Sequence, residues 1–211
     1  ITMDEISFIG VATPGTANNV TGVVEYANNI PFLQYPLAAN LSALMDGKPV
    51  YIENDANAAA KAEAMAGVAA GAPISVMITL GTGLGGGIVI DGKVYTGFNF
   101  AGAELGHIVI EKDGRQCSCG RKGCWEAYSS ATGLVNITKD YINAAKAEGK
   151  TTVMEEMVGG DLSKVSARTA FNAMKQGDEV GAAAVDEYIS YLACGIVNIL
   201  NIFQPNVLSI G

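Results

Sequence analysis

One histidine and three cysteines lie close together near the middle of the chain. His107 is followed by Cys117, Cys119 and Cys124, a spacing of H-x9-C-x-C-x4-C. Three thiolates and one imidazole form the closed tetrahedral ligand set that zinc prefers in structural sites. A secreted disulfide scaffold would spread its cysteines through a shorter chain. The spacing therefore predicts structural zinc in a reducing compartment, and the alternative is a group of reduced thiols beside an ordinary histidine.

A glycine-rich run, Gly81 to Gly87, can present backbone amides to a phosphate. Gly81, Gly83 and Gly86 match G-x-G-x-x-G in form, but that dinucleotide fingerprint requires a helix after the glycines. The next residues, 88–92, predict a strand and a turn, so we reject the dinucleotide interpretation. An anion-binding hairpin and a glycine-rich turn without a ligand both stay open.

Three carboxylates stand where they can act on a ligand. Asp55 follows an apolar run, Pro49 to Ile52, and precedes an Ala-rich stretch. Ligands gather at the carboxyl ends of strands in α/β sheets, and the helix dipole keeps a nearby Asp ionised, so Asp55 can accept a proton from a hydroxyl. Helix capping is the alternative role. Glu104 and Glu126 flank the cysteine cluster and either bind a polyhydroxylated ligand or are solvated surface acids.

Hydrophobic periodicity predicts the elements that position these residues. A helix is expected over 57–70, and 75–80 with 87–95 read as a strand meander that turns at Asp91-Gly92. From Ala131 onward the pattern is mostly helical. Strands are predicted at Ser7–Val11, Pro49–Ile52, Ser75–Leu80, Gly87–Ile90 and Val207–Ile210.

The last predicted helix, over 181–202, carries a single apolar stripe. An α/β first part followed by strands and then helices predicts two lobes, over residues 1–73 and 74–211. Both ends of the chain coincide with strand-like runs, so we expect an internal fragment. The stripe comprises Val185, Ile189, Leu192, Ile196 and Leu200.

Composition narrows the class of protein. Of 211 residues, 49% are hydrophobic and 16% are charged, which predicts a sizeable core. The net charge of −8 argues against a nucleic-acid surface, because phosphate binding needs clustered Lys and Arg. No run approaches the ~18 apolar residues of a membrane span, and no signal peptide is seen, so we expect a cytoplasmic protein.

Six segments, taken together and in order, resemble the signatures of ROK-family sugar kinases. The last is the most specific, the resemblance covers nearly the whole chain, and it is tightest from Val50 to Ser130. Within the family, bacterial glucokinases are the most similar. The segments are Gly10–Gly15, Asn29–Pro31, Glu53–Ala59, Gly81–Gly87, Ala103–His107 and Cys117–Glu126.

The resemblance implies an actin-like (ribonuclease H-like) ATPase fold with two lobes, truncated at both ends. It implies ATP-dependent phosphorylation of a hexose, and we expect glucose to be phosphorylated at its 6-hydroxyl. Asp55 matches the catalytic base. Thr82 and Gly83 match a phosphate loop, and Mg²⁺ would offset the phosphate charge. His107 would contact both zinc and sugar. The sugar-contacting positions are Asn54, Asp55, Glu104, His107 and Glu126, with Gly15 and Asn29 as weaker matches.

Two family segments lie outside the sequence: the first phosphate loop and the adenosine motif expected after Gly211. We therefore expect this fragment to bind ATP poorly. The sugar-sensing domain of a ROK-family transcriptional repressor is the main alternative, and a zinc-stabilised interaction domain is a third. The intact segment around Asp55 favours the kinase, because a sensor needs no base. A homodimer is expected, and the identity of the hexose stays open.

Overall fold

The computed structural model describes residues 2–211, and the packing of the backbone divides them into two units. Unit 1 takes the residues up to 78, with 86–104 and 205–211, and unit 2 takes 79–85 and 105–204. The chain therefore passes between the units four times. These units are defined by backbone contacts and do not test the lobe boundary predicted between residues 73 and 74, which stays a prediction.

A parallel strand pair in unit 1 positions the candidate catalytic segment. Strand β1 (Ile9–Thr13) pairs with β5 (Val50–Asn54), and Thr13 lies opposite Asn54. Both strands end at the same edge, where ligands gather in α/β sheets. Helix α2 (Asp55–Ala66) follows β5 without an intervening loop, two residues earlier than predicted.

A small antiparallel sheet follows β1 and was not predicted. It comprises β2 (Thr16–Asn18), β3 (Val23–Tyr26) and β4 (Leu33–Tyr35), and α1 (Leu37–Leu44) comes next. Its strands have three or four residues, too few to show the alternating pattern of a half-buried strand. A compact core fixes this region, formed by Ala17, Val24, Ala27, Leu37 and Ile52.

A four-stranded sheet has the order β8-β7-β6-β9, with bounds Lys93–Val94, Leu84–Ile90, Ile74–Leu80 and Val207–Ile210. Strand β9 runs parallel to β6, and Ser75 lies opposite Val207 although they are far apart in sequence. Asp91 and Gly92 have φ of 49° and 72°, the left-handed geometry of a two-residue hairpin turn. The predicted turn is therefore confirmed.

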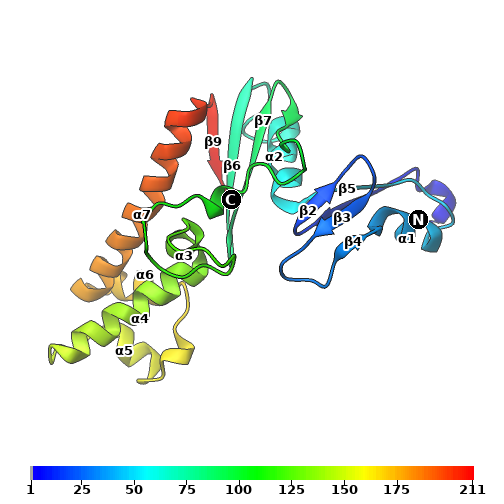
Figure 1. Ribbon diagram of the computed structural model, residues 1–211. Helices are drawn as coiled ribbons and strands as arrows, with labels where there is room; N and C mark the ends of the chain where they lie inside the picture. The colour runs from blue at the N-terminus through cyan, green and yellow to red at the C-terminus, as the bar shows by residue number, and fades with distance from the viewer. Residues whose placement is uncertain (1) are drawn as a thin grey trace. The chain divides into compact units, whose positions relative to one another are not determined.

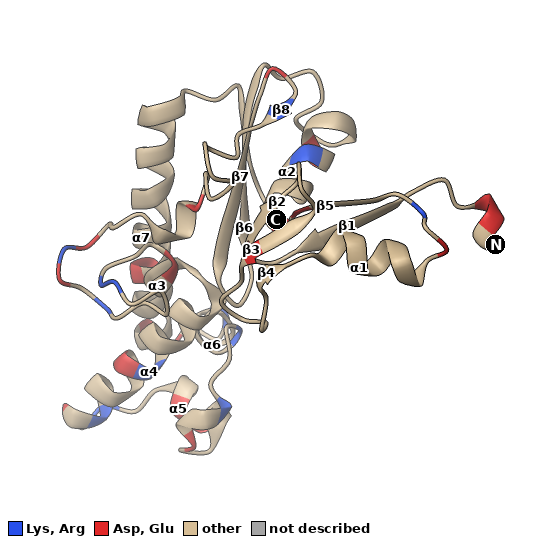
Figure 2. Ribbon diagram, turned by 45° about the vertical axis from the view of Figure 1, so that its right-hand side comes forward, with Lys and Arg blue, Asp and Glu red and all other residues tan. Residues whose placement is uncertain are grey.

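The helices of unit 2 are α3 (Glu126–Ser129), α4 (Ala131–Ala147), α5 (Val153–Val158), α6 (Thr169–Lys175) and α7 (Glu179–Phe203). Helices α4 and α6 pack against α7 (Figure 1). Figure 2 shows Lys and Arg as short, separated segments along the ribbon. Short 3-10 helices lie at Met3–Glu5, Leu105–His107 and Leu162–Lys164. The core includes Leu134, Ile137, Ile142, Met154, Val158, Ala170, Ala173 and Val185.

Asp178 accepts hydrogen bonds from the N-terminal ends of two helices, α5 and α7. Its Oδ1 accepts hydrogen bonds from the backbone amides of Val180 (2.8 Å) and Gly181 (3.1 Å) at the start of α7. Its Oδ2 accepts from the Thr152 hydroxyl and the Val153 amide, both at 2.5 Å. Although burial raises the pKa of Asp178, these four donors lower it below 3.8 overall.

The residues of the apolar stripe predicted on α7 differ in burial, and Val185 is buried. Ile189 is 49% exposed and Leu200 is 38% exposed. Gly195 lies on a neighbouring face of the helix, which is buried against the side chain of Trp125. The buried positions are Gly181, Ala184, Val185, Tyr188, Gly195 and Ile199.

Helix α7 also revises the expectation that no run is long enough to cross a membrane. By length and composition alone, Glu179–Phe203 reaches that threshold. Core helices of globular domains pass the same test, and α7 packs against α4 and α6. The length of α7 is therefore weak evidence for a membrane span.

Candidate functional site

The four predicted metal ligands come together in unit 2. The ligand atoms of His107, Cys117, Cys119 and Cys124 all lie within 4.8 Å of one another. The Sγ atoms of Cys119 and Cys124 are 3.6 Å apart, and Cys117 Sγ is 3.7 Å from His107 Nδ1. Zn–S bonds of about 2.3 Å in a tetrahedron place sulfur atoms about 3.8 Å apart. The cluster therefore has the dimensions of a four-ligand zinc site.

The three thiols of the cluster differ in environment. Burial raises the pKa of the Cys124 thiol to about 12 and also raises the pKa of Cys117. Cys119 is exposed. Partial burial raises the pKa of its thiol, but hydrogen bonds with the Arg121 amide and the other two thiols together lower this pKa by more, so the net shift is downward. A bound cation would displace the thiol protons, because thiolates are the ligating species.

A tight backbone shapes the segment 107–126, which we call the metal loop. Gly123 has φ of +78°, and a Cβ there would lie 1.7 Å from the backbone oxygen of Glu111. The amide of Ile110 donates to the Gly123 carbonyl at 2.9 Å, and the Cys117 amide donates to the Arg121 carbonyl at 2.9 Å. These close approaches bring the distant ligands together.

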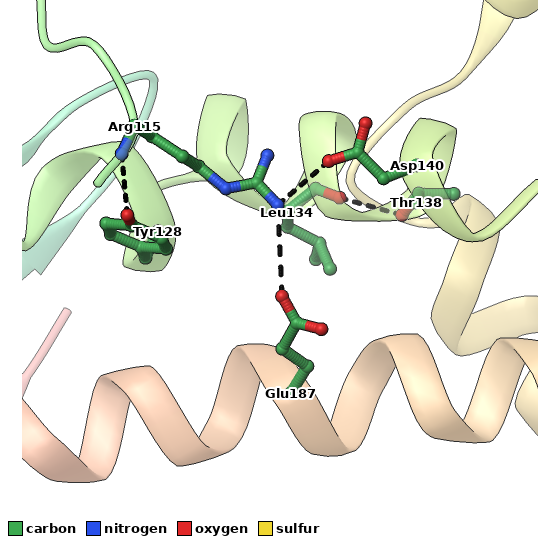
Figure 3. Close-up of polar contacts among 6 residues, drawn as sticks. All are labelled: Arg115, Tyr128, Leu134, Thr138, Asp140 and Glu187. Carbon is green, nitrogen blue, oxygen red and sulfur yellow. Dashed lines mark hydrogen bonds and ion pairs between the residues drawn. The ribbon is translucent and has the colours of Figure 1, made fainter. Parts of the chain in front are cut away.

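Arg115 anchors the metal loop to two helices of unit 2. Its guanidinium lies 2.9 Å from the carboxylate of Asp140 in α4 and 3.8 Å from that of Glu187 in α7. Tyr128 contacts the same residue twice: its Oη accepts a hydrogen bond from the Arg115 backbone amide at 2.7 Å, and its ring lies under the guanidinium. Figure 3 shows Arg115 extending toward both carboxylates, beside the Thr138–Leu134 hydrogen bond within α4.

The glycine turn, residues 81–85, lies in the same unit as the metal loop. The Gly81 carbonyl accepts the Ala131 amide at 2.9 Å, and the Thr82 carbonyl accepts the Thr132 hydroxyl at 2.7 Å. Within residues 2–211, the amides of Thr82 and Gly83 have no hydrogen-bond acceptor. Two adjacent amides with this freedom can bind an anion.

In unit 1, the candidate base stands at the first position of α2. Asn54 is the helix cap, because its Oδ1 accepts the Asn57 amide at 3.1 Å. Asp55 is exposed, and its Oδ1 accepts the Ala56 amide at 2.9 Å. Capping is thus performed by Asn54, and the Asp55 carboxylate keeps lone pairs for another partner.

Polar contacts fix the turn that carries Asp55. Asn54 Nδ2 donates to the Gly15 carbonyl at 3.1 Å, which brings these two predicted residues together. Glu53, which was not among the predicted site residues, accepts the Asn54 amide at 2.9 Å and Asn19 Nδ2 at 2.8 Å. Its position at the end of a strand was the signal for this role.

Two of the predicted sugar-contacting residues lie in exposed positions. Asn29 is exposed in the loop between β3 and β4, and Glu104 is exposed just before the 3-10 helix that carries His107. An open pocket of about 440 Å³ in unit 1 lies on other residues. It is lined by Thr16, Asn18, Glu25, Asn99, Phe100 and Ala101.

The sequence pattern of the ROK family matches residues 2–211, and the chain belongs to this family. Its fold class is the actin-like ATPase fold of ROK sugar kinases, as predicted. A solved structure of a ROK glucokinase from Streptomyces griseus, in complex with glucose and AMPPNP, matches with a TM-score of 0.83 at 33% identity. That match covers 98% of this chain and 65% of the other.

Curated relatives include both enzymes and regulators. A glucokinase of Thermotoga maritima is 34% identical over 209 residues, covering 99% of this chain and 64% of the relative. The xylose repressor of Caldicellulosiruptor bescii is 30% identical over 204 residues, covering 96% of this chain and 49% of the relative. The chain thus spans less than two thirds of the length of the relatives that it matches.

Proposed function

We propose that the chain carries the sugar-binding and proton-abstracting part of an ATP-dependent hexose kinase, with glucose phosphorylated at the 6-hydroxyl. The observation that carries the proposal is the geometry at the start of α2. Asn54 caps the helix, so the exposed carboxylate of Asp55 is available to a substrate hydroxyl. An ionised carboxylate at a helix N-terminus is a suitable base for that proton.

In this proposal the sugar is held by side chains rather than by zinc. Asn54 exchanges hydrogen bonds with the sugar hydroxyls, and the carboxylates of Glu104 and Glu126 accept hydrogen bonds from them. Gly15 and Asn29 are weaker matches to the sugar-contacting positions. The free amides of Thr82 and Gly83 bind the phosphates of ATP, whose charge Mg²⁺ offsets. Transfer then depends on positioning and electrostatic stabilisation.

Zinc has a structural role in this proposal. The four ligands leave no open coordination position, so the ion would order the metal loop rather than polarise the substrate. His107 faces Cys117 with Nδ1, which leaves Nε2 to bind a sugar hydroxyl. A ligand bond at one ring nitrogen fixes the tautomer at the other, so the metal would preorganise this contact.

The sugar-sensing domain of a repressor is the second candidate. A solved ROK-family transcriptional regulator matches with a TM-score of 0.83 at 29% identity, as well as the glucokinase structure does. Sugar contacts serve both functions equally, whereas a base is useful only to the kinase. The placement of Asp55 therefore favours the kinase. The cytoplasmic location and the homodimer stay predictions.

A panel of hexoses separates these functions. The protein at its natural length is assayed for ADP release with Mg-ATP and glucose, N-acetylmannosamine, N-acetylglucosamine, fructose or allose. The kinase proposal predicts sugar-dependent ADP release, with glucose the best substrate. Sugar binding without ADP release would support the repressor. If no hexose bound or reacted, both candidates would be excluded.

A further inference from the structure

The carboxylate of Glu126 links the metal loop to the glycine turn. Its Oε2 accepts the backbone amide of Leu84 at 3.0 Å. Its Oε1 lies 3.5 Å from the Ser118 hydroxyl and 3.8 Å from the Cys117 sulfur. One side chain therefore contacts a candidate metal ligand with one oxygen and the glycine turn with the other. All of these residues belong to unit 2.

The glycine turn is shaped to receive this carboxylate. A Cβ at residue 83 would lie 2.4 Å from Glu126 Oε2, so the glycine lets the carboxylate approach the turn in this position. A Cβ at residue 106 would lie 2.0 Å from the Leu84 carbonyl oxygen. The backbone of Gly106, next to His107, therefore packs directly against Leu84. Leu84 is thus held through its amide by Glu126 and packed at its carbonyl by Gly106.

The backbone of Glu126 is tied directly to the ligand cluster. Glu126 follows Cys124 by two residues, and the intervening Trp125 is fully buried. The Trp125 amide donates to the Ile108 carbonyl at 2.8 Å, one residue after His107. A cation bound by both His107 and Cys124 would therefore hold the two segments that the Ile108–Trp125 hydrogen bond joins. It would thereby fix the backbone position of Glu126.

The rest of the glycine turn is held by a different element. The Gly81 and Thr82 carbonyls are held by the start of α4. Among the hydrogen bonds of the described residues, the Leu84 amide is the turn's link to the metal loop. The direction of the free Thr82 and Gly83 amides accordingly depends on two anchors, one at α4 and the other at Glu126.

We propose that Glu126 is a positioning residue through which metal binding at His107, Cys117, Cys119 and Cys124 orders the glycine turn. Metal loading holds the Glu126 backbone, the carboxylate holds the Leu84 amide, and the neighbouring amides are thereby aimed at a common point. That this point receives a phosphate rests on the proposed function. The ordering of the turn itself does not.

Residue-resolved hydrogen exchange tests this coupling in the full chain. The exchange of the Leu84 amide is measured by NMR with one equivalent of Zn²⁺ and after its removal by a chelator. The variants are Glu126→Ala, which removes the carboxylate, and Glu126→Gln, which keeps its shape and a weaker acceptor. Asp113→Asn is the matched control, since it neutralises an exposed carboxylate of the same loop. Zinc content is measured for each protein.

Zinc is expected to slow Leu84 exchange about tenfold or more in the wild type and in Asp113→Asn, because a charge-assisted hydrogen bond is then held in place. Glu126→Ala should still bind one zinc and protect the Cys117 amide, while Leu84 exchanges equally fast with and without the ion. Glu126→Gln should lie between these results.

Three results would overturn the proposal: no zinc binding by the wild type, Leu84 exchange that ignores zinc, or zinc-dependent Leu84 protection that persists in Glu126→Ala. A loss of zinc from both Glu126 variants would also overturn it, because the residue would then support the cluster itself. None of these readouts involves phosphorylation. Failure of the kinase proposal, seen as absent ADP release, is therefore distinguishable from failure of this inference.

Discussion

The indole Nε1 of Trp125 donates a hydrogen bond to the backbone carbonyl of Tyr191, in the middle of α7, at 3.1 Å. The ring of Trp125 is fully buried, and it faces α7 at Gly195. Trp125 separates Cys124 from Glu126 and is the sole tryptophan of the chain. The metal loop is therefore packed into the helical core through a residue whose fluorescence reports on that packing.

Gly195→Ala should destabilise unit 2 by about 2–3 kcal/mol. Alanine in a helix interior ordinarily stabilises by about 1 kcal/mol over glycine. Here the new Cβ would lie 2.0 Å from Trp125 Cε2, so overpacking outweighs propensity. Urea unfolding followed by Trp125 fluorescence measures the change. Cys194→Ala, at the exposed neighbouring position, is the control and should shift stability by less than about 0.5 kcal/mol. A Gly195→Ala protein as stable as the wild type would contradict the packing described.

Zinc should protect one exposed cysteine from alkylation and leave the other reactive. Cys119 and Cys194 are both exposed, but only Cys119 belongs to the ligand cluster. Coordination removes the sulfur lone pair that attacks the reagent, so iodoacetamide should label Cys194 alone in the zinc-loaded protein. After chelation Cys119 should be labelled as well. Peptide mass spectrometry reads both sites, and equal labelling of Cys119 in the two states would argue against the metal site.

Asp178→Ala should cost about 2–4 kcal/mol at neutral pH, because it leaves buried amide donors unpaired and removes the cap of α7. The folded pKa of Asp178 is lowered below its ordinary 3.8. Its stabilisation is therefore present above about pH 4 and is lost as the pH falls through the folded pKa. Urea unfolding at about pH 7 and at about pH 3 should show the gap between variant and wild type shrink in acid. A gap independent of pH would mean that the charge of Asp178 contributes little.

Arg115→Ala should loosen the metal loop with only a modest effect on global stability, about 1–2 kcal/mol. The ion pairs are partly solvated, with the Asp140 side chain 62% exposed, so each contributes little. The contact with the Tyr128 ring adds about 0.5–1 kcal/mol. Zinc affinity, measured by competition with a chromogenic chelator, should fall more than for Lys122→Ala, which removes an exposed cation of the same loop. Equal affinities for the two variants would exclude an anchoring role.

The ligand cluster was predictable because zinc restricts both the type and the spacing of its ligands. His107 and the three cysteines satisfy that restriction in the sequence itself, and the strands with four or more apolar residues were predicted within a few positions. The bond from Glu126 to Leu84 and the ion pairs of Arg115 were not predictable. They join residues far apart in sequence, and single charged or apolar residues carry no signal of their distant partner.

Strand pairing shows the same limit. The turn at Asp91-Gly92 has a local signature, whereas the pairing of Ser75 with Val207 depends on packing across most of the chain. On α7, periodicity identified an apolar stripe that includes Ile189 and Leu200, but it did not indicate the face at Gly195, which packs against the indole of Trp125. Features with a local sequence signature could thus be predicted, whereas strand pairing and the buried face of α7 depend on tertiary contacts.

The most direct test of the proposed function compares Asp55→Asn with the wild type in the natural-length protein, by sugar-dependent ADP release and by glucose titration. Asp46→Asn, an exposed aspartate of unit 1, is the control. Loss of a general base should lower kcat by about 10²–10⁴-fold, with glucose binding changed by less than about threefold. An Asp55→Asn protein that phosphorylates glucose at the wild-type rate would contradict the central claim.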